Sequence, residues 1–132
     1  MQPGKYILRQ EAPEFVLDEV MQLFGKNMEL IEKKSDWGHH GWFRLVFRYV
    51  PKNYYIDIEG EFNSFTIRII NEDDGYIALE QAVDYENCIT GENVHKAVDK
   101  LRAVLETDIS FYKVINGKRY RQIDGQYKRV KK

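Results

Sequence analysis

The sequence has a single cysteine and no long apolar run. Because Cys88 is alone, an intramolecular disulfide is excluded, which is typical of a chain kept in a reducing compartment. No stretch approaches the roughly 18 apolar residues of a membrane span. The first residues also lack the basic and apolar segments of a signal peptide. The sequence therefore predicts a cytoplasmic protein with no membrane segment.

Catalytic and cofactor motifs are also missing. The chain has no Walker, Rossmann, Gly-x-Ser-x-Gly or Cys-x-x-Cys pattern. The acidic turn at residues 71–75 is too short for a calcium loop of about twelve residues and lacks its distal glutamate. The adjacent histidines His39 and His40 do not make a closed metal site. We therefore predict a non-enzymatic protein that binds no metal or cofactor.

One group of residues has the types needed for a nucleophilic enzyme. Cys88 and His95 flank the expected start of a helix, where a thiolate is stabilised, and Asp84 lies shortly before them. The acidic residues around Cys88 disfavour the thiolate, so the favoured interpretation is a half-buried structural thiol. An enzyme that uses Cys88 and His95 stays open as a third possibility.

Length and composition predict a folded chain with two helices. At 132 residues, with 43% hydrophobic and 31% charged residues, the chain can bury one core without metal or disulfides. The first helix is expected at residues 13–24, with Pro13 in its first turn and Gly25 as its stop. The second is expected at residues 91–106, with Thr90 as its N-cap and apolar residues at helical spacing.

Between these helices the apolar period changes to two, which is typical of strands with one buried face. Short polar turns separate the strands, so neighbouring strands should pair antiparallel. The fold prediction is therefore α+β, with an antiparallel meander sheet of about five strands and two amphipathic helices packed on one face. The strands are expected at residues 28–34, 43–49, 54–59, 65–69 and 76–83.

The C-terminal residues predict a small β-meander of their own. Asn116-Gly117 and Asp124-Gly125 are strong hairpin signals, because both central residues of a type I′ turn need a positive φ. With two-residue turns at these positions, Lys113 lies opposite Tyr120, and Tyr120 lies opposite Arg129.

The sign of the net charge changes where the C-terminal meander begins. Residues 1–111 hold 12 Lys and Arg against 20 Asp and Glu, a net charge of −8, whereas residues 112–132 hold 8 against 1, a net charge of +7. We expect a single domain over residues 1–132, with an acidic α+β body at 1–110 and a basic C-terminal β-meander at 111–132. Separated fields of this kind favour binding to a charged partner.

Strand parity predicts a charged face on the sheet. If the apolar residues share one face, the charged residues share the other, where basic strands flank an acidic one. Opposite charges on adjacent strands stabilise pairing by roughly 0.2–1 kcal/mol per pair. The charged set is Arg44, Arg48, Asp57, Glu59, Glu61 and Arg68.

We interpret the chain as a protein-binding module, most simply a small inhibitor of the immunity-protein type whose acidic surface covers a basic site on another protein. Charge steers association in such a complex, and aromatic residues anchor it. The segment from Asp36 to Trp42 is unusual, since two tryptophans and two glycines bracket the histidine pair. The expected partner-binding residues are Asp57, Glu59, Glu61, Glu72, Asp73 and Asp74, with Trp37 or Trp42 as a possible anchor.

The alternative from another class is nucleic-acid binding by the C-terminal meander. Basic residues alternate there with tyrosines, and such a surface can follow phosphates and stack exposed bases. The acidic remainder of the chain weakens this alternative, because it repels a polyanion. The residues that would bind nucleic acid are Lys118, Arg119, Tyr120, Arg121, Tyr127, Lys128 and Arg129.

Overall fold

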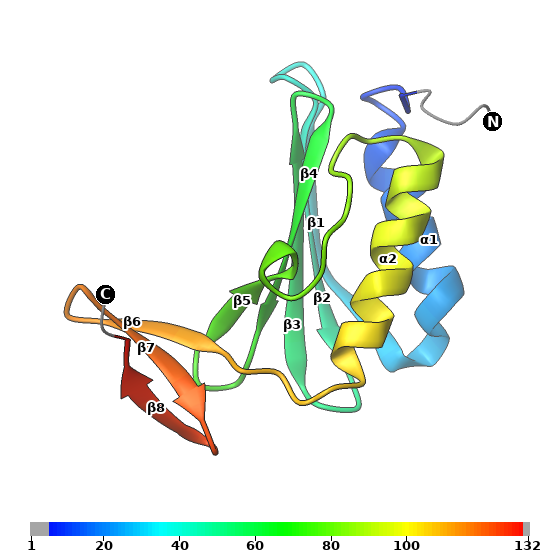
Figure 1. Cartoon of the computed structure of the whole chain (residues 1–132). Coiled ribbons are helices and arrows are strands. Elements are labelled where there is room, and N and C mark those ends of the chain that lie inside the picture. Colours follow the sequence, from blue (N-terminus) through cyan, green and yellow to red (C-terminus); the bar gives the residue numbers. More distant parts are fainter. Residues whose placement is uncertain (1–5, 131–132) are drawn as a thin grey trace.

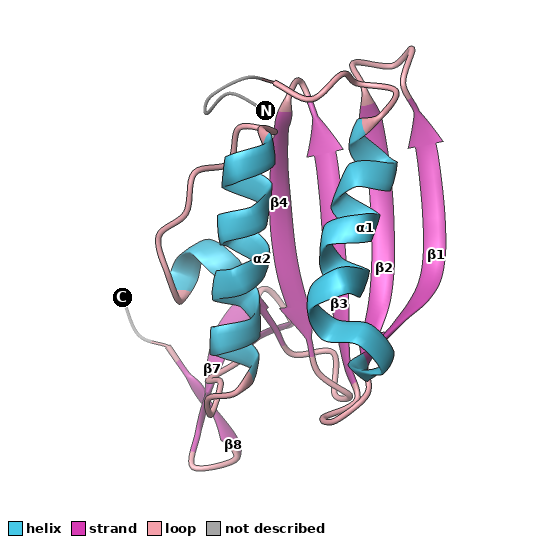
Figure 2. Cartoon of the chain, turned by 90° about the vertical axis from the view of Figure 1, so that its right-hand side faces the viewer, coloured by secondary structure: helices cyan, strands magenta, loops and turns pink. Residues whose placement is uncertain are grey.

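The computed structural model describes residues 6–130. The chain is an α+β structure in which two helices cover one face of an antiparallel sheet and leave the other face open (Figures 1 and 2). Lys131 and Lys132, which belong to the predicted basic meander, lie outside the described residues. In chain order the elements are α1 (Ala12–Phe24), η1 (Gly25–Asn27), β1 (Met28–Asp36), β2 (Trp42–Tyr49), β3 (Tyr54–Glu61), β4 (Ser64–Ile70), β5 (Tyr76–Ala78), η2 (Leu79–Gln81), α2 (Gly91–Leu105), β6 (Tyr112–Ile115), β7 (Lys118–Ile123) and β8 (Gln126–Arg129).

Both helices begin and end within one residue of their predicted bounds. Pro13 lies in the first turn of α1. Gly25, the residue directly after α1, ends that helix with a φ of 55°. The Thr90 side chain caps α2 by accepting a hydrogen bond from the Asn93 backbone N at 3.0 Å. The buried stripes are Val16, Val20 and Phe24 in α1, and Val94, Val98, Leu101 and Leu105 in α2.

The core lies between these helices and the central strands. Leu45 of β2 pairs with Ile58 of β3, which pairs with Ile67 of β4, so one apolar row crosses three strands. All three side chains are fully buried. Burying a side chain of this kind contributes about 1.5–3 kcal/mol, so this row and its neighbours hold the helices to the sheet.

The fifth strand is much shorter than the sequence predicts. After Ala78 the chain turns into η2 instead of continuing to residue 83. The Gln81 side chain accepts a hydrogen bond from the Ala78 backbone N at 2.8 Å, and Leu79 is fully buried at the turn. The local hydrogen bond and the burial of Leu79 together favour the turn over a longer strand.

The C-terminal meander is part of the same sheet and not a separate one. The eight strands follow one another in chain order, and β5 joins β6 through the single pair Tyr76–Tyr112. We call β6, β7 and β8 the arm. The arm projects from the body at the end where α2 finishes (Figure 1).

Within the arm the predicted register is confirmed. Lys113 pairs with Tyr120, and Tyr120 pairs with Arg129. Both hairpin turns have positive φ at their two central residues, at Asn116-Gly117 and at Asp124-Gly125. The turn residues therefore fix this pairing, as the sequence indicates.

The open face of the body sheet carries the predicted charge lattice. Asp57 of β3 pairs with Arg68 of β4 and with Val46 of β2, and an ion pair joins its carboxylate to Arg44, two residues along β2. Glu32 of β1 lies 3.6 Å from the same guanidinium. The face that the helices leave open is thus crossed by a network of paired charges.

Candidate functional site

Two hairpin turns meet at one end of the molecule. The turn between β1 and β2 and the turn between β3 and β4 lie side by side at the top of Figure 1. The Phe62 backbone N donates a hydrogen bond to the His40 carbonyl at 2.9 Å, and the two rings stack with 4.2 Å between their centroids. His39 lies against His40, with 5.0 Å between the ring centroids.

Arg9 connects the two turns. Its Nε donates a hydrogen bond to the Asn63 side chain at 3.3 Å. Its aliphatic carbons lie over Gly41, where an added Cβ would be 2.8 Å from the Arg9 side chain. A residue larger than glycine at position 41 would therefore displace Arg9, which joins the two turns in addition to the Phe62–His40 hydrogen bond.

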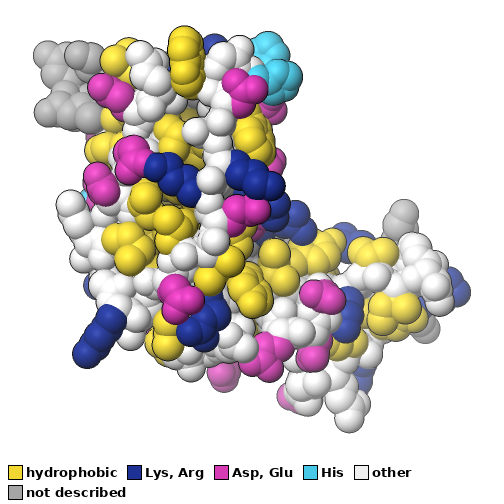
Figure 3. Space-filling model, turned by 180° about the vertical axis from the view of Figure 1, so that it is seen from behind, with side chains coloured by type: hydrophobic (Ala, Val, Ile, Leu, Met, Phe, Trp, Pro, Cys, Tyr) yellow, Lys and Arg dark blue, Asp and Glu magenta, His cyan; other side chains and the backbone are white. Residues whose placement is uncertain are grey.

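The end of the molecule so formed exposes large apolar side chains. The exposed fractions are 63% for Trp37, 60% for Phe62 and 59% for Leu8. Hydrophobic and histidine side chains also lie together at the upper end of the space-filling view (Figure 3). We call Leu8, Trp37, His39, His40 and Phe62 the aromatic tip. Clustered apolar exposure of this kind is typical of a surface that binds another molecule.

Phe62 adopts a backbone conformation that a bulky residue rarely takes. Its φ is 53°, and that of Asn63 is 63°, so this pair forms the centre of a turn that normally holds asparagine, aspartate or glycine. The left-handed region costs an ordinary L-residue roughly 1–2 kcal/mol. Because the Phe62 ring is exposed, burial in the core does not offset this cost. Backbone strain with an exposed aromatic ring is a feature of binding sites.

The expected acidic patch is divided between two ends of the sheet. Glu61 is at the tip, where its carboxylate lies 4.0 Å from His39 Nε2, and Glu59 is nearby on the same strand. Glu72, Asp73 and Asp74 follow the far end of β4, about 20 Å away at roughly 3.3 Å per residue. There Glu72 accepts a hydrogen bond from the Asn53 side chain at 2.6 Å. The structure thus brings Glu61 to His39, in the turn that carries Trp37, and separates it from the acidic turn.

Two other expected partner-binding residues have little free surface. Asp57 is only 9% exposed, and its carboxylate is paired with Arg44, so it offers no free charge. Trp42 is half-buried at the start of β2, opposite Asp36. The exposed tryptophan of the segment is Trp37.

Two of the three tyrosine rings of the arm, those of Tyr112 and Tyr127, already have partners. Guanidinium groups of Arg119 and Arg121 lie 4.9 and 5.8 Å from the centre of the Tyr112 ring. Lys113 lies over the Tyr127 ring, whose hydroxyl accepts a hydrogen bond from Asn71 at 2.8 Å. These contacts leave little ring surface for a stacked base.

The cations of the arm are more available than its rings. Within residues 6–130, none of the arm's Lys and Arg side chains makes an ion pair with a carboxylate. Tyr120 is half-buried. The exposed cations are Lys118, Arg119, Arg121, Lys128 and Arg129.

The candidate nucleophile and base have separate partners. His95 Nδ1 lies 3.2 Å from a carboxylate oxygen of Glu19 on α1. Cys88 lies beside Tyr6, and its hydrogen bond and charge raise the pKa of the Tyr6 hydroxyl. Neither contact links Cys88 to His95.

The described residues contain no group of three or more His, Cys, Asp or Glu side chains placed to hold a metal ion. Neither helix within residues 6–130 has the length and hydropathy of a membrane span.

Sequence analysis did not identify Phe62. An aromatic residue in a two-residue turn, between strands that end at Glu61 and begin at Ser64, is the signal that could have indicated it. Comparison with protein-family models, with curated proteins and with solved structures gave no match.

Proposed function

We propose that this chain is a non-enzymatic protein-binding module that inserts its aromatic tip into a partner protein. The observation that carries the proposal is Phe62, which is 60% exposed and has a φ of 53°. Sequence choices that cost stability without a local gain concentrate at functional sites. Phe62 and Trp37, which lie in the two turns that meet at this end, supply the rigid apolar area typical of residues that dominate binding energy.

The charges beside the tip favour a basic partner surface. Asp36 directly precedes Trp37, and Glu61 lies 4.0 Å from His39 of the same turn. Glu59 lies on the same side of the body sheet as Glu61. Carboxylates at the rim of an apolar anchor speed association with a basic surface and orient it. A small inhibitor of the immunity-protein type, which covers a basic site of a toxin or effector, combines these features.

Site-specific photocrosslinking in the source cells tests this proposal and does not require the partner to be identified first. A photoreactive benzoylphenylalanine replaces Phe62 in one variant and Glu72, at the opposite end of the sheet, in a matched control. We expect a discrete protein adduct from position 62 and none of the same mass from position 72. Absence of an adduct at position 62, or the same adduct from both positions, would overturn the proposal.

Once a partner is purified, affinity measurements refine the test. Phe62→Asn keeps the turn favourable while removing the ring, and Trp37→Ser removes the second anchor. Each is expected to weaken binding by at least about tenfold, the usual effect of truncating a central interface residue. Glu72→Gln is the control and should stay within about twofold of the unaltered protein. Equal affinity for Phe62→Asn and the unaltered protein would contradict an anchoring role.

Nucleic-acid binding by the arm is a second candidate, favoured by one observation. Lys118, Arg119, Lys128 and Arg129 are exposed and make no ion pair among the described residues. With the Tyr112 and Tyr127 rings covered, such binding would depend on phosphate contacts. It predicts that affinity for single-stranded RNA falls steeply with salt and is lost when the four cations are neutralised. Salt-independent binding, or no binding at low salt, would exclude it.

A further inference from the structure

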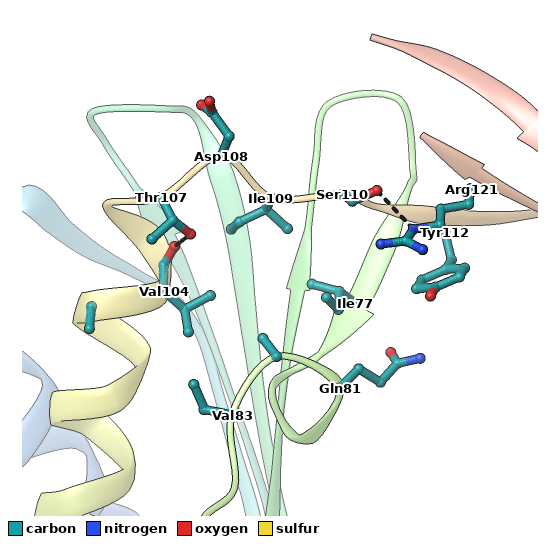
Figure 4. A pocket seen from close by; sticks show the side chains of 12 residues that line it. Ile77, Gln81, Val83, Val104, Thr107, Asp108, Ile109, Ser110, Tyr112 and Arg121 are labelled. Carbon is teal, nitrogen blue, oxygen red and sulfur yellow. Dashed lines mark hydrogen bonds between the residues drawn. The ribbon is translucent and has the colours of Figure 1, made fainter. Parts of the chain in front are cut away.

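A pocket lies between the body and the arm, at the end of the molecule opposite the aromatic tip. Its volume is about 380 Å³, within the range of small-ligand sites. Apolar side chains from four segments line it, and they come from β5, the segment after η2, the end of α2 and the segment before the arm (Figure 4). These side chains are Ile77, Val83, Val104 and Ile109.

One charged group is held at the mouth of this pocket. Arg121 reaches from β7 over the pocket, and its Nε donates a hydrogen bond to Ser110 Oγ at 3.1 Å (Figure 4). The Ser110 hydroxyl in turn donates to the Gln122 carbonyl, and the Tyr112 ring lies 5.8 Å from the guanidinium. These contacts orient the guanidinium through Nε and leave its two terminal nitrogens for a ligand.

No acidic group neutralises Arg121 within the described part of the chain. It makes no ion pair there, and Asp108, which also borders the pocket, points away from it (Figure 4). The Val104 carbonyl at the end of α2 is also occupied, since the Thr107 backbone N and hydroxyl donate to it at 3.0 and 2.7 Å. The pocket therefore combines an apolar interior with one unneutralised, oriented cation.

From this arrangement we propose that the pocket binds a carboxylate attached to a short branched apolar group. The terminal nitrogens of Arg121 match the two oxygens of a carboxylate, a geometry that strengthens the hydrogen bonds by charge. The apolar group then fills the space between Ile77, Val83 and Ile109. Two sources share this chemistry, a free aliphatic acid and the C-terminal residue of a peptide. The site is independent of the aromatic tip.

The test follows the methyl resonances of isotope-labelled Ile and Val side chains during titration with 4-methylpentanoate. We expect saturable shifts at Ile77 and Ile109, and unchanged signals from the core residues Ile56 and Ile67. The matched uncharged ligand 4-methylpentanamide is expected to bind at least about tenfold more weakly. Equal affinity for acid and amide, or no shift at the pocket methyls, would overturn the proposal.

Variants locate the charge and the apolar part of the site separately. Arg121→Gln should remove the preference for acid over amide. Arg119→Gln is the matched control, because Arg119 contacts the same tyrosine ring but does not line the pocket. Ala103→Met, on the pocket side of α2, should block both ligands while leaving the core signals in place. If Arg119→Gln lowers acid binding as much as Arg121→Gln, the assignment to Arg121 is wrong.

Two further experiments distinguish the two sources of the carboxylate and show whether this site is separate from the aromatic tip. The peptide acetyl-Gly-Gly-Leu is compared with its C-terminal amide. Tighter binding of the free peptide than of 4-methylpentanoate identifies a peptide C-terminus, and the reverse order identifies a free acid. Phe62→Asn should leave binding of the acid unchanged. Failure of the protein-binding proposal would therefore not affect this site, nor would failure here affect that proposal.

Discussion

The guanidinium of Arg44 holds the carboxylate of Asp57 through two nitrogens, with Nε 3.2 Å from Oδ1 and Nη2 3.0 Å from Oδ2. The hydrogen bond and charge of Asp57 raise the pKa of Arg44. This pair lies in the middle of the open sheet face and stabilises the pairing of β2 with β3. Asp57 is thus a structural residue, although its sequence position gave it the same predicted role as Glu59.

Asp57→Asn should therefore lower the free energy of unfolding by about 1–3 kcal/mol, because it removes the well-buried carboxylate from the Arg44 guanidinium and leaves the more exposed Glu32 beside it. Urea denaturation measures this loss. Glu59→Gln, two residues along the same strand and exposed, is the control and should change stability by less than about 0.5 kcal/mol. Arg44→Gln should cost less in the Asp57→Asn background than in the unaltered chain. Additive losses would show that the pair is not coupled.

Phe62→Asn should raise the free energy of unfolding by about 0.5 kcal/mol or more, even though it removes an aromatic ring. Asparagine tolerates positive φ, and the relief of strain exceeds the lost stacking on His40. Thermal and urea denaturation measure the change. Asn116→Phe is the reciprocal variant, since it places phenylalanine at the first central position of another hairpin turn, and it should destabilise the chain. A destabilised Phe62→Asn would indicate that the ring supports the fold.

Gly75→Ala should loosen the arm from the body. A methyl group at Gly75 would overlap the Tyr127 hydroxyl and approach Asn71 Nδ2, the two groups that hydrogen-bond between body and arm. We expect faster trypsin cleavage within the arm, where Lys and Arg are frequent, and little change in body stability. Gly38→Ala is the control, because a methyl group there meets only the Asp36 carboxylate at 3.7 Å. Unchanged cleavage in Gly75→Ala would show that other contacts hold the arm.

Tyr85 should make stability depend on pH in the alkaline range. Its hydroxyl is buried and has no hydrogen-bond partner within the described chain. Burial, assisted by the charge of Glu80, raises its pKa above the ordinary value of 10.0. The Ile67 backbone acts in the opposite direction and is the smallest of the three influences on this pKa.

The unfolded chain therefore loses the Tyr85 proton at a lower pH than the folded chain. The free energy of unfolding falls as pH rises past 10.0, because the folded state then binds more protons than the unfolded state. Tyr85→Phe should reduce this fall and should equal or exceed the unaltered chain in stability at neutral pH. Urea denaturation between neutral and alkaline pH measures both effects. The same alkaline slope in both proteins would contradict the role of Tyr85.

Local chemistry made the helices and hairpins predictable. Pro13, Gly25 and Thr90 mark helix ends through constraints that act within a few residues, and Asn116-Gly117 sets a turn for the same reason. Alternation of apolar residues assigned β2, β3 and β4 their buried faces. These features need no information from distant parts of the chain.

The features that could not be predicted from the sequence depend on contacts between residues that are far apart in the chain. Parity placed Asp57 on the open face but could not show that Arg44 would cover it. The acidic residues of β3 and of the turn after β4 are near in sequence, yet the strand between them carries the chain to the other end of the sheet. The pocket beside Arg121 is formed by segments that are far apart in sequence, so no local pattern indicates it.

The arm and the tip lie at opposite ends of the molecule, and the arm's region carries +7 while the remainder carries −8 (Figure 1). A molecule built this way has a permanent electric dipole along its length. In the field of a basic protein it experiences a torque that turns the arm away before any contact forms. At 0.1 M salt the molecule is turned in this way once it comes within the Debye length, about 10 Å, of the basic surface. A basic partner of the kind proposed above would thus meet the molecule already oriented with its tip forward.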